Sequence, residues 1–380
     1  MTDSWDRPGC YRVADGVFRI PLQMPQDGLR AINVYALETT RGLALVDGGW
    51  HRNSTHAELS DALALIGRSP AEIHDIYVTH VHRDHYTFAV ELRRRHGSRI
   101  HLGAAESPGI AAIAKLGNNV PESSILQLHR SGAVTIAEQV YRDSVDEPFE
   151  PSDWEAPDHW LSPGALDISG HRFSAVHTPG HTKGHMVFHD LDRGISFTGD
   201  HVLPTITPSI GFELGDWELP LGAYLRSLEM MLDDRDRIMM PAHGDTGASL
   251  HARCRELLAH HDYRLDQTAS AVVELREASG LQVAQVLTWT RRERGFDSLD
   301  TFNQMVATCE TLAHLDVLVD RGQLSVQNKN GVDLFSSNRR DPPRLSQVSG
   351  AGPTAVDIKL GAGDERRVVA RQESNGGSNF

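Results

Sequence analysis

Four potential metal ligands stand within six positions of this chain, His80-Val-His82-Arg-Asp84-His85, and this run limits the possible folds and functions more than any other feature of the sequence. The run follows residues 73–79, a stretch of β-forming residues that predicts a strand. Because side chains two apart on an extended segment point the same way, His80 and His82 are expected to face one metal ion. The chain must then turn, which brings Asp84 and His85 to a neighbouring point suited to a second ion.

A polar loop in a histidine-rich chain is the alternative interpretation. The chain has 21 histidines, yet four such residues in so short a window arise by chance in only about one in a few hundred chains. Three later segments, at 177–185, 197–201 and 241–245, each place a further potential ligand after a β run, where Pro or Gly supplies a turn. The expected ligands are His80, His82 and His181 for one ion, Asp84, His85 and His243 for the other, and Asp200 as the bridge.

The hydrophobic pattern predicts a layered α/β fold over residues 1–250, with sheet between helices. Early strands are expected at 17–22, 32–37, 42–46 and 73–79, helices at 55–66 and 87–95, and later strands at 172–177, 186–189 and 194–198. Residues 104–158 are polar and helix-permissive, which predicts a helical insertion. It forms either a lid over the metals, whose apolar side chains would favour an acyl chain or ring, or a buttress packed away from them. The Pro-rich segment 203–211 is either a second wall of the site or an ordinary loop.

Residues 251–335 show three helical stretches and then a Gly-containing hairpin, which is the outline of a winged-helix module. Residues 336–380 are rich in Gly, Ser, Arg, Asp and Pro, so a disordered tail is expected. Between positions 254 and 335 there are 8 Lys and Arg but 12 Asp and Glu. A nucleic-acid-binding face should be basic, so the module is expected to act as a cap over the substrate groove or as a homodimer contact.

Five short elements occur in order at 45–49, 79–85, 178–181, 198–200 and 242–244. With them, residues 17–250 resemble the metallo-β-lactamase superfamily in its glyoxalase II-like branch of dinuclear hydrolases. The resemblance implies an αββα sandwich with two metals at one edge and the ligand assignment given above. It also implies that Asp47 orients a ligand, against the alternative of a simple Asp-Gly turn. His177, His185 and His201 are expected to be neighbours of ligands, with a lesser role as donors or proton shuttles, and His51, His74, His260 and His261 to be ordinary polar residues.

The function expected from these residues is a dinuclear hydrolase holding two divalent ions, Zn²⁺ first, with Mn²⁺ or Fe as alternatives. A metal-bridging hydroxide would attack a small ester, thioester or lactone carbonyl, and Asp84 would pass the proton to the leaving group. An RNA-processing endonuclease is the main alternative; an iron-dependent redox relative and a metal-free scaffold are the others.

Three departures narrow the substrate range that the resemblance implies. Asp200 stands where common β-lactamases have a cysteine ligand, so antibiotic hydrolysis is not expected. Leu203 stands where lactonases of this superfamily carry a catalytic tyrosine, and the chain continues into a winged helix where glyoxalase II enzymes have basic helices. These differences weaken the lactone and the glutathione-thioester hypotheses.

Composition places the expected enzyme in the cytoplasm, with no membrane partner. The start of the chain has no basic region followed by an apolar stretch, and no later segment reaches 18 uninterrupted apolar residues. The three cysteines, Cys10, Cys254 and Cys309, are scattered, which favours free thiols in a reducing compartment. A net charge of −14 argues against a general polyanion-binding surface.

Overall fold

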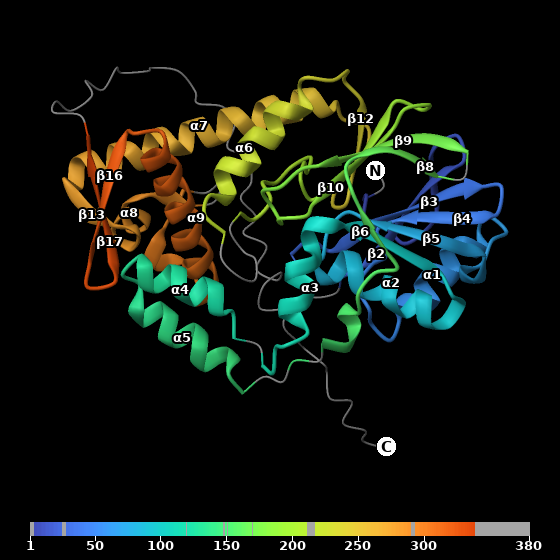
Figure 1. Ribbon diagram of the computed structural model, residues 1–380, viewed down its shortest axis with the longest axis horizontal. Helices are drawn as coiled ribbons and strands as arrows, with labels where there is room; N and C mark the ends of the chain where they lie inside the picture. Colours follow the sequence, from blue (N-terminus) through green and yellow to red (C-terminus); the bar gives the residue numbers. More distant parts are fainter. Residues whose placement is uncertain are drawn as a thin grey trace.

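The computed structural model describes residues 4–24, 28–118, 120–146, 149, 151–168, 170–210, 217–289 and 293–338. Two β-sheets lie face to face in one half of the structure, on the right in Figure 1. The first sheet has seven strands in chain order: β1 (Tyr11–Ala14), β2 (Val17–Gln23), β3 (Ala31–Thr39), β4 (Gly42–Val46), β5 (Ile73–Val78), β6 (Arg99–Gly103) and β7 (His159–Leu161). Strands β1 to β4 are antiparallel, and β4 to β7 are parallel.

The second sheet has five strands in the spatial order β12-β11-β10-β9-β8. Their bounds are β8 (Gly164–Ile168), β9 (His171–His177), β10 (Met186–Asp190), β11 (Ile195–Gly199) and β12 (Ile238–Pro241). Neighbouring strands are antiparallel except β11 and β12, which are parallel.

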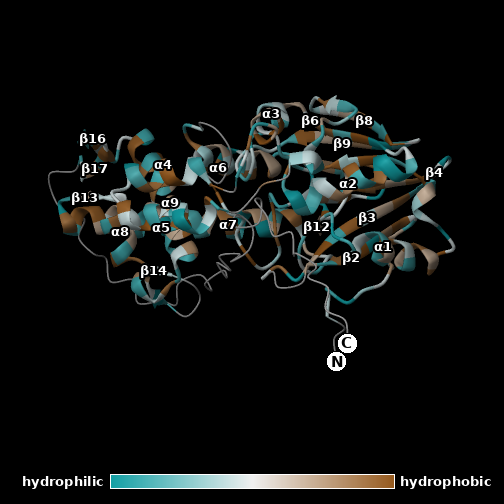
Figure 2. Ribbon diagram, turned by 90° about the horizontal axis from the view of Figure 1, so that it is seen from below, coloured by the Kyte–Doolittle hydropathy of each residue, from teal (hydrophilic) through white to brown (hydrophobic). Residues whose placement is uncertain are grey.

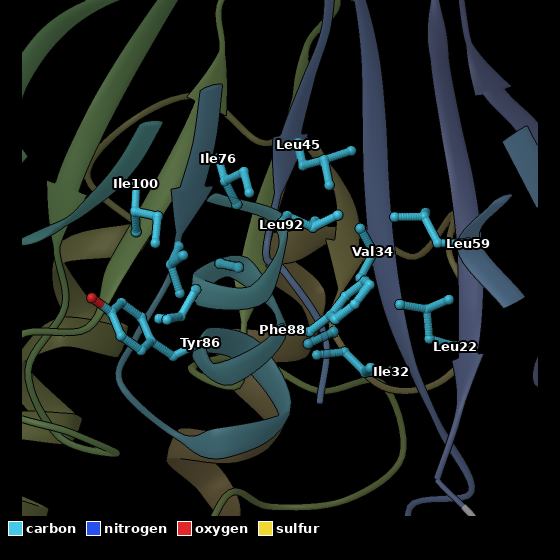
Figure 3. Close-up of a cluster of buried hydrophobic side chains, with 14 of the residues drawn as sticks. Leu22, Ile32, Val34, Leu45, Leu59, Ile76, Tyr86, Phe88, Leu92 and Ile100 are labelled. Carbon is cyan, nitrogen blue, oxygen red and sulfur yellow. The ribbon is translucent and has the colours of Figure 1, made fainter. Parts of the chain in front are cut away.

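Side-chain alternation along the strands explains the layers. On β3, Ile32 and Val34 pack into a core beneath helices α1 (Thr55–Ala64) and α2 (Arg83–His96), whereas Tyr35 and Leu37 pack into the core between the sheets. Successive strand residues point to opposite faces, so a strand that is apolar on both faces must be covered twice. Figure 3 shows Phe88 and Leu92 of α2 among the side chains of the first core.

The second sheet is covered on its outer face by α6 (Pro220–Met231) and α7 (Leu250–Leu275). On β10, Met186 and Phe188 face the core between the sheets, and Val187 faces the helices. The result is the four-layered αββα sandwich that the sequence predicts.

Within the described positions, residues 104–158 contain helical elements joined by turns and irregular segments, with a single bridge residue at Asn118. The helical elements are η2 (Ala104–Glu106), α3 (Ser107–Ile113), α4 (Glu122–Arg130), α5 (Val134–Ser144) and η3 (Pro151–Trp154). Helix α3 and η3 stay with the first sheet, since Ile110 of α3 and Trp154 of η3 belong to its core. Helices α4 and α5 instead lie against α9 (Thr301–Asp320), where Arg130 forms a two-pronged ion pair with Asp316 (Figure 1). Figure 2 shows hydrophilic and hydrophobic residues mixed on α4 and α5, as expected of helices that bury one face. Helix α9, in contrast, is buried on most sides.

After α7 come short elements that pack together with α9: β13 (Glu277–Ser279), α8 (Gly280–Val286), β14 (Thr288–Trp289), β15 (Arg294–Gly295), η4 (Phe296–Ser298), β16 (Leu324–Lys329) and β17 (Val332–Ser337). Strands β13, β17 and β16 form a three-stranded sheet, and β14 pairs with β15. No helix in the described part of the chain has the length and apolar character needed to cross a bilayer.

Several predicted bounds differ from the structure. The helix expected over 87–95 begins at Arg83, so two expected ligands lie in its first turn. The helix predicted over 253–278 is α7, which ends earlier, at Leu275, because Arg276 adopts a φ of +67° and the chain enters β13, which pairs with β17. Strand β17 continues to Ser337, two residues into the expected tail. The remainder of that tail, 339–380, lies outside the described residues, as does residue 211 of the Pro-rich segment.

Candidate metal centre

The ends of several strands meet at one edge of the sandwich, and the expected ligands follow them. Strand β5 leads into the loop that carries His80 and His82, and α2 begins at once with Asp84 and His85 in its first turn. Strand β11 leads into Asp200, and its parallel neighbour β12 leads into residues 242–243. Parallel strands end at the same edge of a sheet, which is why segments far apart in sequence converge here.

Three imidazoles form the first ligand group. His181 Nε2 lies 3.2 Å from His80 Nε2 and 3.0 Å from His82 Nδ1. All three side chains are buried, and their ligand atoms lie within 4.8 Å of one another. Imidazole nitrogens at this spacing can converge on one borderline metal such as zinc.

Asp84, His85 and His243 form the second group. Asp84 Oδ2 lies 3.3 Å from His243 Nε2 and 3.6 Å from His85 Nε2. The three side chains are fully or almost fully buried. A carboxylate with two imidazoles is a second ligand set of the kind that zinc, manganese or iron accepts.

Asp200 lies between the two groups and faces both. Its Oδ1 is 3.6 Å from His85 Nε2 and 3.4 Å from His243 Nε2, while its Oδ2 is 3.7 Å from His181 Nε2. One carboxylate therefore offers one oxygen to each group. The structure thus brings together all seven residues that the sequence singled out as ligands.

The chemistry of these side chains fits two cations. The buried atoms without a hydrogen-bond partner at this site are Asp84 Oδ1 and Oδ2, His85 Nε2, Asp200 Oδ1 and His243 Nε2. Buried polar atoms are costly unless they are bonded, and these five all point into one small region. Metal coordination would satisfy them together.

Asp47 orients His85 from behind. It follows β4, adopts a φ of +62°, and places Oδ2 3.0 Å from His85 Nδ1. Asp47 Oδ1 accepts hydrogen bonds from the backbone amide and the hydroxyl of Thr79, at 2.8 and 2.9 Å. With Nδ1 of His85 donating to Asp47, the lone pair of the imidazole is on Nε2, which faces the second ligand group. The geometry matches the orienting role rather than a simple turn.

Backbone carbonyls orient two further imidazoles. His181 Nδ1 donates to Ser209 O at 2.9 Å, and His243 Nδ1 donates to Ala31 O at 2.8 Å. Each bond leaves Nε2 free to act as a ligand. Ser209 belongs to the Pro-rich segment, so that segment lies beside the first ligand group.

The electrostatic environment differs between the two groups. Burial lowers the pKa of His82 to about 4, and burial together with the neighbouring His82 lowers that of His181 to about 3. Burial opposes protonation of His85 and His243 as well, but the surrounding carboxylates outweigh it. They raise the pKa of His85 to about 9 and that of His243 to about 10. The first group is therefore neutral at pH 7, and the imidazoles of the second are protonated when no metal competes.

The other histidines of the motifs have different surroundings. His185 is buried next to the site, where its Nε2 accepts from the backbone amide of Asp200 at 3.2 Å. His177 contacts the carbonyl of Lys183 through its Nε2, at 2.7 Å. His201 is buried with its ring against Tyr224. None of the three belongs to the ligand groups found among the described residues.

Three supporting residues escaped the sequence analysis: Thr79, Glu106 and Trp154. Thr79 bonds Asp47, Glu106 contacts both ligand loops, and Trp154 Nε1 donates to Val81 O at 3.2 Å. Thr79 stands within the motif at 79–85 and was open to prediction as a hydrogen-bonding neighbour. Glu106 and Trp154 stand alone in the helical insertion, where no spacing rule points to them.

The family model described as the metallo-beta-lactamase superfamily matches residues 27–243, more than half of the chain. The chain belongs to the metallo-β-lactamase superfamily. The matched range contains both ligand groups and ends at His243, the last of the seven residues. It also contains the strands and helices of all four layers except β1, β2 and α7.

Curated relatives within the superfamily match over parts of their length. The lactamase-like protein nscB of Aspergillus fumigatus is 31% identical over 173 residues, 42% of this chain and 47% of its own. The atrochrysone carboxyl ACP thioesterase of Aspergillus chevalieri is 35% identical over 30% of this chain and 33% of its own. The hydroxyacylglutathione hydrolase GloC of Haemophilus influenzae is 28% identical over 44% and 68%. The chain spans about half the length of the first of these relatives.

Solved structures resemble this superfamily member over more of the chain. A metallo-beta-lactamase family protein of Thermus thermophilus covers 86% of this chain and 100% of its own, at 25% identity and a TM-score of 0.65. A beta-lactamase domain protein of Burkholderia ambifaria covers 88% and 96%, at 23% identity and a TM-score of 0.72. These shares exceed what residues 1–250 alone can supply, so the likeness of fold extends into the elements after α7.

Proposed function

We propose that this chain is a metal-dependent hydrolase that holds two divalent ions, most simply Zn²⁺, and cleaves a small acyl substrate, with a thioester or ester preferred to a lactone. The observation that carries the proposal is Asp200, whose two oxygens face separate ligand groups. A carboxylate that faces both ligand groups would let the chain hold two ions side by side, the arrangement that two-metal hydrolytic chemistry uses.

Two such ions, when bound, supply Lewis acidity and a hydroxide nucleophile near neutral pH. The residues of the chain supply position and proton transfer. The neighbouring His85 and His243 outweigh the effect of burial and hold the pKa of Asp84 far below its usual range, so this carboxylate is ionised at neutral pH. Asp84 accepts the proton of the attacking water and delivers it to the leaving group.

The substrate class is inferred from named relatives and from the candidate ligand set. Two relatives, by name a thioesterase and a hydroxyacylglutathione hydrolase, support an acyl substrate. Asp200 in place of a cysteine ligand argues against a β-lactamase.

We also propose that residues 251–335 form a winged-helix module that acts as a cap or a homodimer contact. The element order α7, β13, α8, α9, β16, β17 supports this interpretation. The excess of acidic over basic residues there favours a protein contact over nucleic acid.

The test is a substrate panel of esters, acyl-CoA thioesters, lactones and RNA, offered to zinc-loaded and manganese-loaded protein. Wild type should hydrolyse one acyl class and bind about two ions per chain. Asp84→Asn should lower turnover by about 10²- to 10⁴-fold, while Asp61→Asn, an exposed change on α1, should not. RNA cleavage without acyl hydrolysis, or full activity in Asp84→Asn, would refute the proposal.

A further inference from the structure

Glu106 is a buried carboxyl outside the two ligand groups. It ends η2, directly after β6, and has no exposed surface. Its Oε1 accepts a hydrogen bond from the hydroxyl of Thr182, and the carboxylate also accepts from the backbone amides of Val81 and Gly184, whereas Oε2 has no hydrogen-bond partner. All three donors lie in the loops that carry metal ligands.

The positions of these donors matter more than their number. Val81 stands between His80 and His82, and Thr182 directly follows His181. A single carboxylate is therefore bonded to both loops that supply the first ligand group.

Element η2 is closely packed against the loops that carry the first ligand group. A Cβ placed on Gly184 would lie 2.3 Å from Glu106 N and 2.5 Å from Glu106 Cγ, and a Cβ on Gly103 would lie 2.3 Å from Gly184 O. The peptide groups flanking Val81 are also held at two points. Their amide nitrogen bonds Glu106 and their carbonyl accepts from Trp154 Nε1 at 3.2 Å.

We propose that Glu106 is a positioning residue that fixes the separation of loops 79–82 and 178–185 and so sets the metal affinity of the His80, His82 and His181 group. The proposal rests on the metal-binding part of the proposed function and not on its substrate. The second ligand group does not depend on Glu106 in the same way, because Asp84 and His85 lie on α2 and His243 follows β12.

A carboxylate suits this position because it only accepts hydrogen bonds. A glutamine there would have nearly the same shape but no negative charge, and its carbonyl oxygen would accept hydrogen bonds more weakly than an ionised carboxylate does. Its NH₂ group would take the place of Oε2, which has no hydrogen-bond partner. Glu106→Gln therefore changes the hydrogen bonding between the loops while filling the same space. Thr182→Val removes one of the three donors and leaves the carboxylate intact.

The experiment is a zinc titration of the metal-free full chain by calorimetry, with a competing chelator for tight sites. In Glu106→Gln, one of the two sites should weaken by about 10- to 100-fold, the usual cost of losing a partner behind the ligands. The other site should keep its affinity. Thr182→Val should weaken zinc binding at the same site by a smaller factor. Thr182→Ser keeps the hydroxyl donor and should bind zinc as tightly as wild type.

Asp190→Asn is the matched control. Asp190 is also fully buried and accepts the backbone amides of Asp192 and Arg193 at 3.0 and 2.9 Å, but it lies at the far end of β10 from the ligands. Asp190→Asn should lower the stability of the fold without changing the zinc affinity of either site. If Glu106→Gln does not fold, the zinc affinities of Thr182→Val and Thr182→Ser test the proposal instead.

The result that would overturn the proposal is two unchanged zinc sites in Glu106→Gln or, if that variant is unfolded, in Thr182→Val. Equal weakening of both sites would overturn it too. The titration uses no substrate, so the two proposals fail separately. A wild type that binds zinc but hydrolyses no acyl compound refutes the proposed function and leaves the role of Glu106 standing.

Discussion

Asp47 Oδ2 lies 3.0 Å from His85 Nδ1, with both side chains buried beneath the second ligand group. In Asp47→Asn the backbone should persist, because asparagine tolerates the φ of +62° found here. The amide cannot accept both from Thr79 and from His85 as the carboxylate does. We expect zinc affinity of the Asp84, His85 and His243 group to fall by about 10- to 100-fold, measured by titration. Unchanged affinity would show that His85 needs no acceptor behind it.

Gly199 offers a test of how closely the two sheets approach at the site. Its φ is +51°, and an added Cβ would lie 2.6 Å from His185 Nε2 and 2.7 Å from Thr79 Oγ1. Gly199→Ala should therefore lower stability by more than the roughly 1 kcal/mol that a left-handed backbone costs an alanine, and should weaken metal binding through the adjacent Asp200.

Gly194→Ala is its control, since Gly194 has a φ of +68° with open space around it. Thermal unfolding and zinc titration of both variants give the comparison. Equal stability losses in the two would mean that backbone strain alone, and not contact with His185 and Thr79, explains the glycine at 199.

The clustering of the seven candidate ligands could be predicted from the sequence because each lies in a short motif at a strand end. His80, His82, Asp84 and His85 are fixed by one turn, so local geometry nearly determines their relation. The strands that precede them are apolar on one face or on both faces, so their hydrophobic pattern identifies them as strands. The αββα layering followed from the same pattern and the resemblance together.

Other features of the structure could not be predicted from the local sequence. Strands β7 and β8 are short and largely exposed, so they show no alternation to detect. Glu106 is one glutamate in a polar insertion, and its partners Val81 and Thr182 lie 25 and 76 residues away. The packing of α4 and α5 on α9 likewise joins segments more than 150 residues apart. Periodicity predicts which face of a helix is buried but not against what.

Buried histidines in the helical layer predict acid sensitivity. Burial, with Arg264 nearby, lowers the pKa of His314 to about 3, whereas an unfolded chain has a histidine pKa of about 6.5. Below pH 6.5 the unfolded chain takes up a proton that the folded chain does not, so stability falls as pH falls, by up to about 1.4 kcal/mol per pH unit. His314→Gln keeps a donor for Glu310 O and should remove the share of one proton from this slope, to which other buried histidines such as His82 and His181 also contribute.

Urea unfolding of metal-free protein between pH 7 and 5 measures the slope. The control is His74→Gln on β5, an exposed residue, which should leave the slope of wild type intact. If His314→Gln keeps the full wild-type slope of stability against pH, then other groups cause the acid sensitivity. One such group is His261, whose Nδ1 lies 3.2 Å from His314 Nε2.

Proton release should distinguish the two ligand groups. The pKa values of about 9 for His85 and about 10 for His243 mean that both are protonated at pH 7.5 without metal, whereas His82 and His181 are neutral. A metal needs the free lone pair. Filling the second group should release about two protons and filling the first group none, so only the second affinity should rise with pH, up to about 9 to 10.

Calorimetric zinc titration in two buffers of different ionisation enthalpy counts these protons for each site. His243→Asn should reduce the release at the second site by about one. If neither site depends on the buffer, then Asp84, Asp47 and Asp200 do not hold protons on these imidazoles. The carboxylates around His85 and His243 would then have to be compensated by other charges, and the distinction between a neutral and a protonated group would fail.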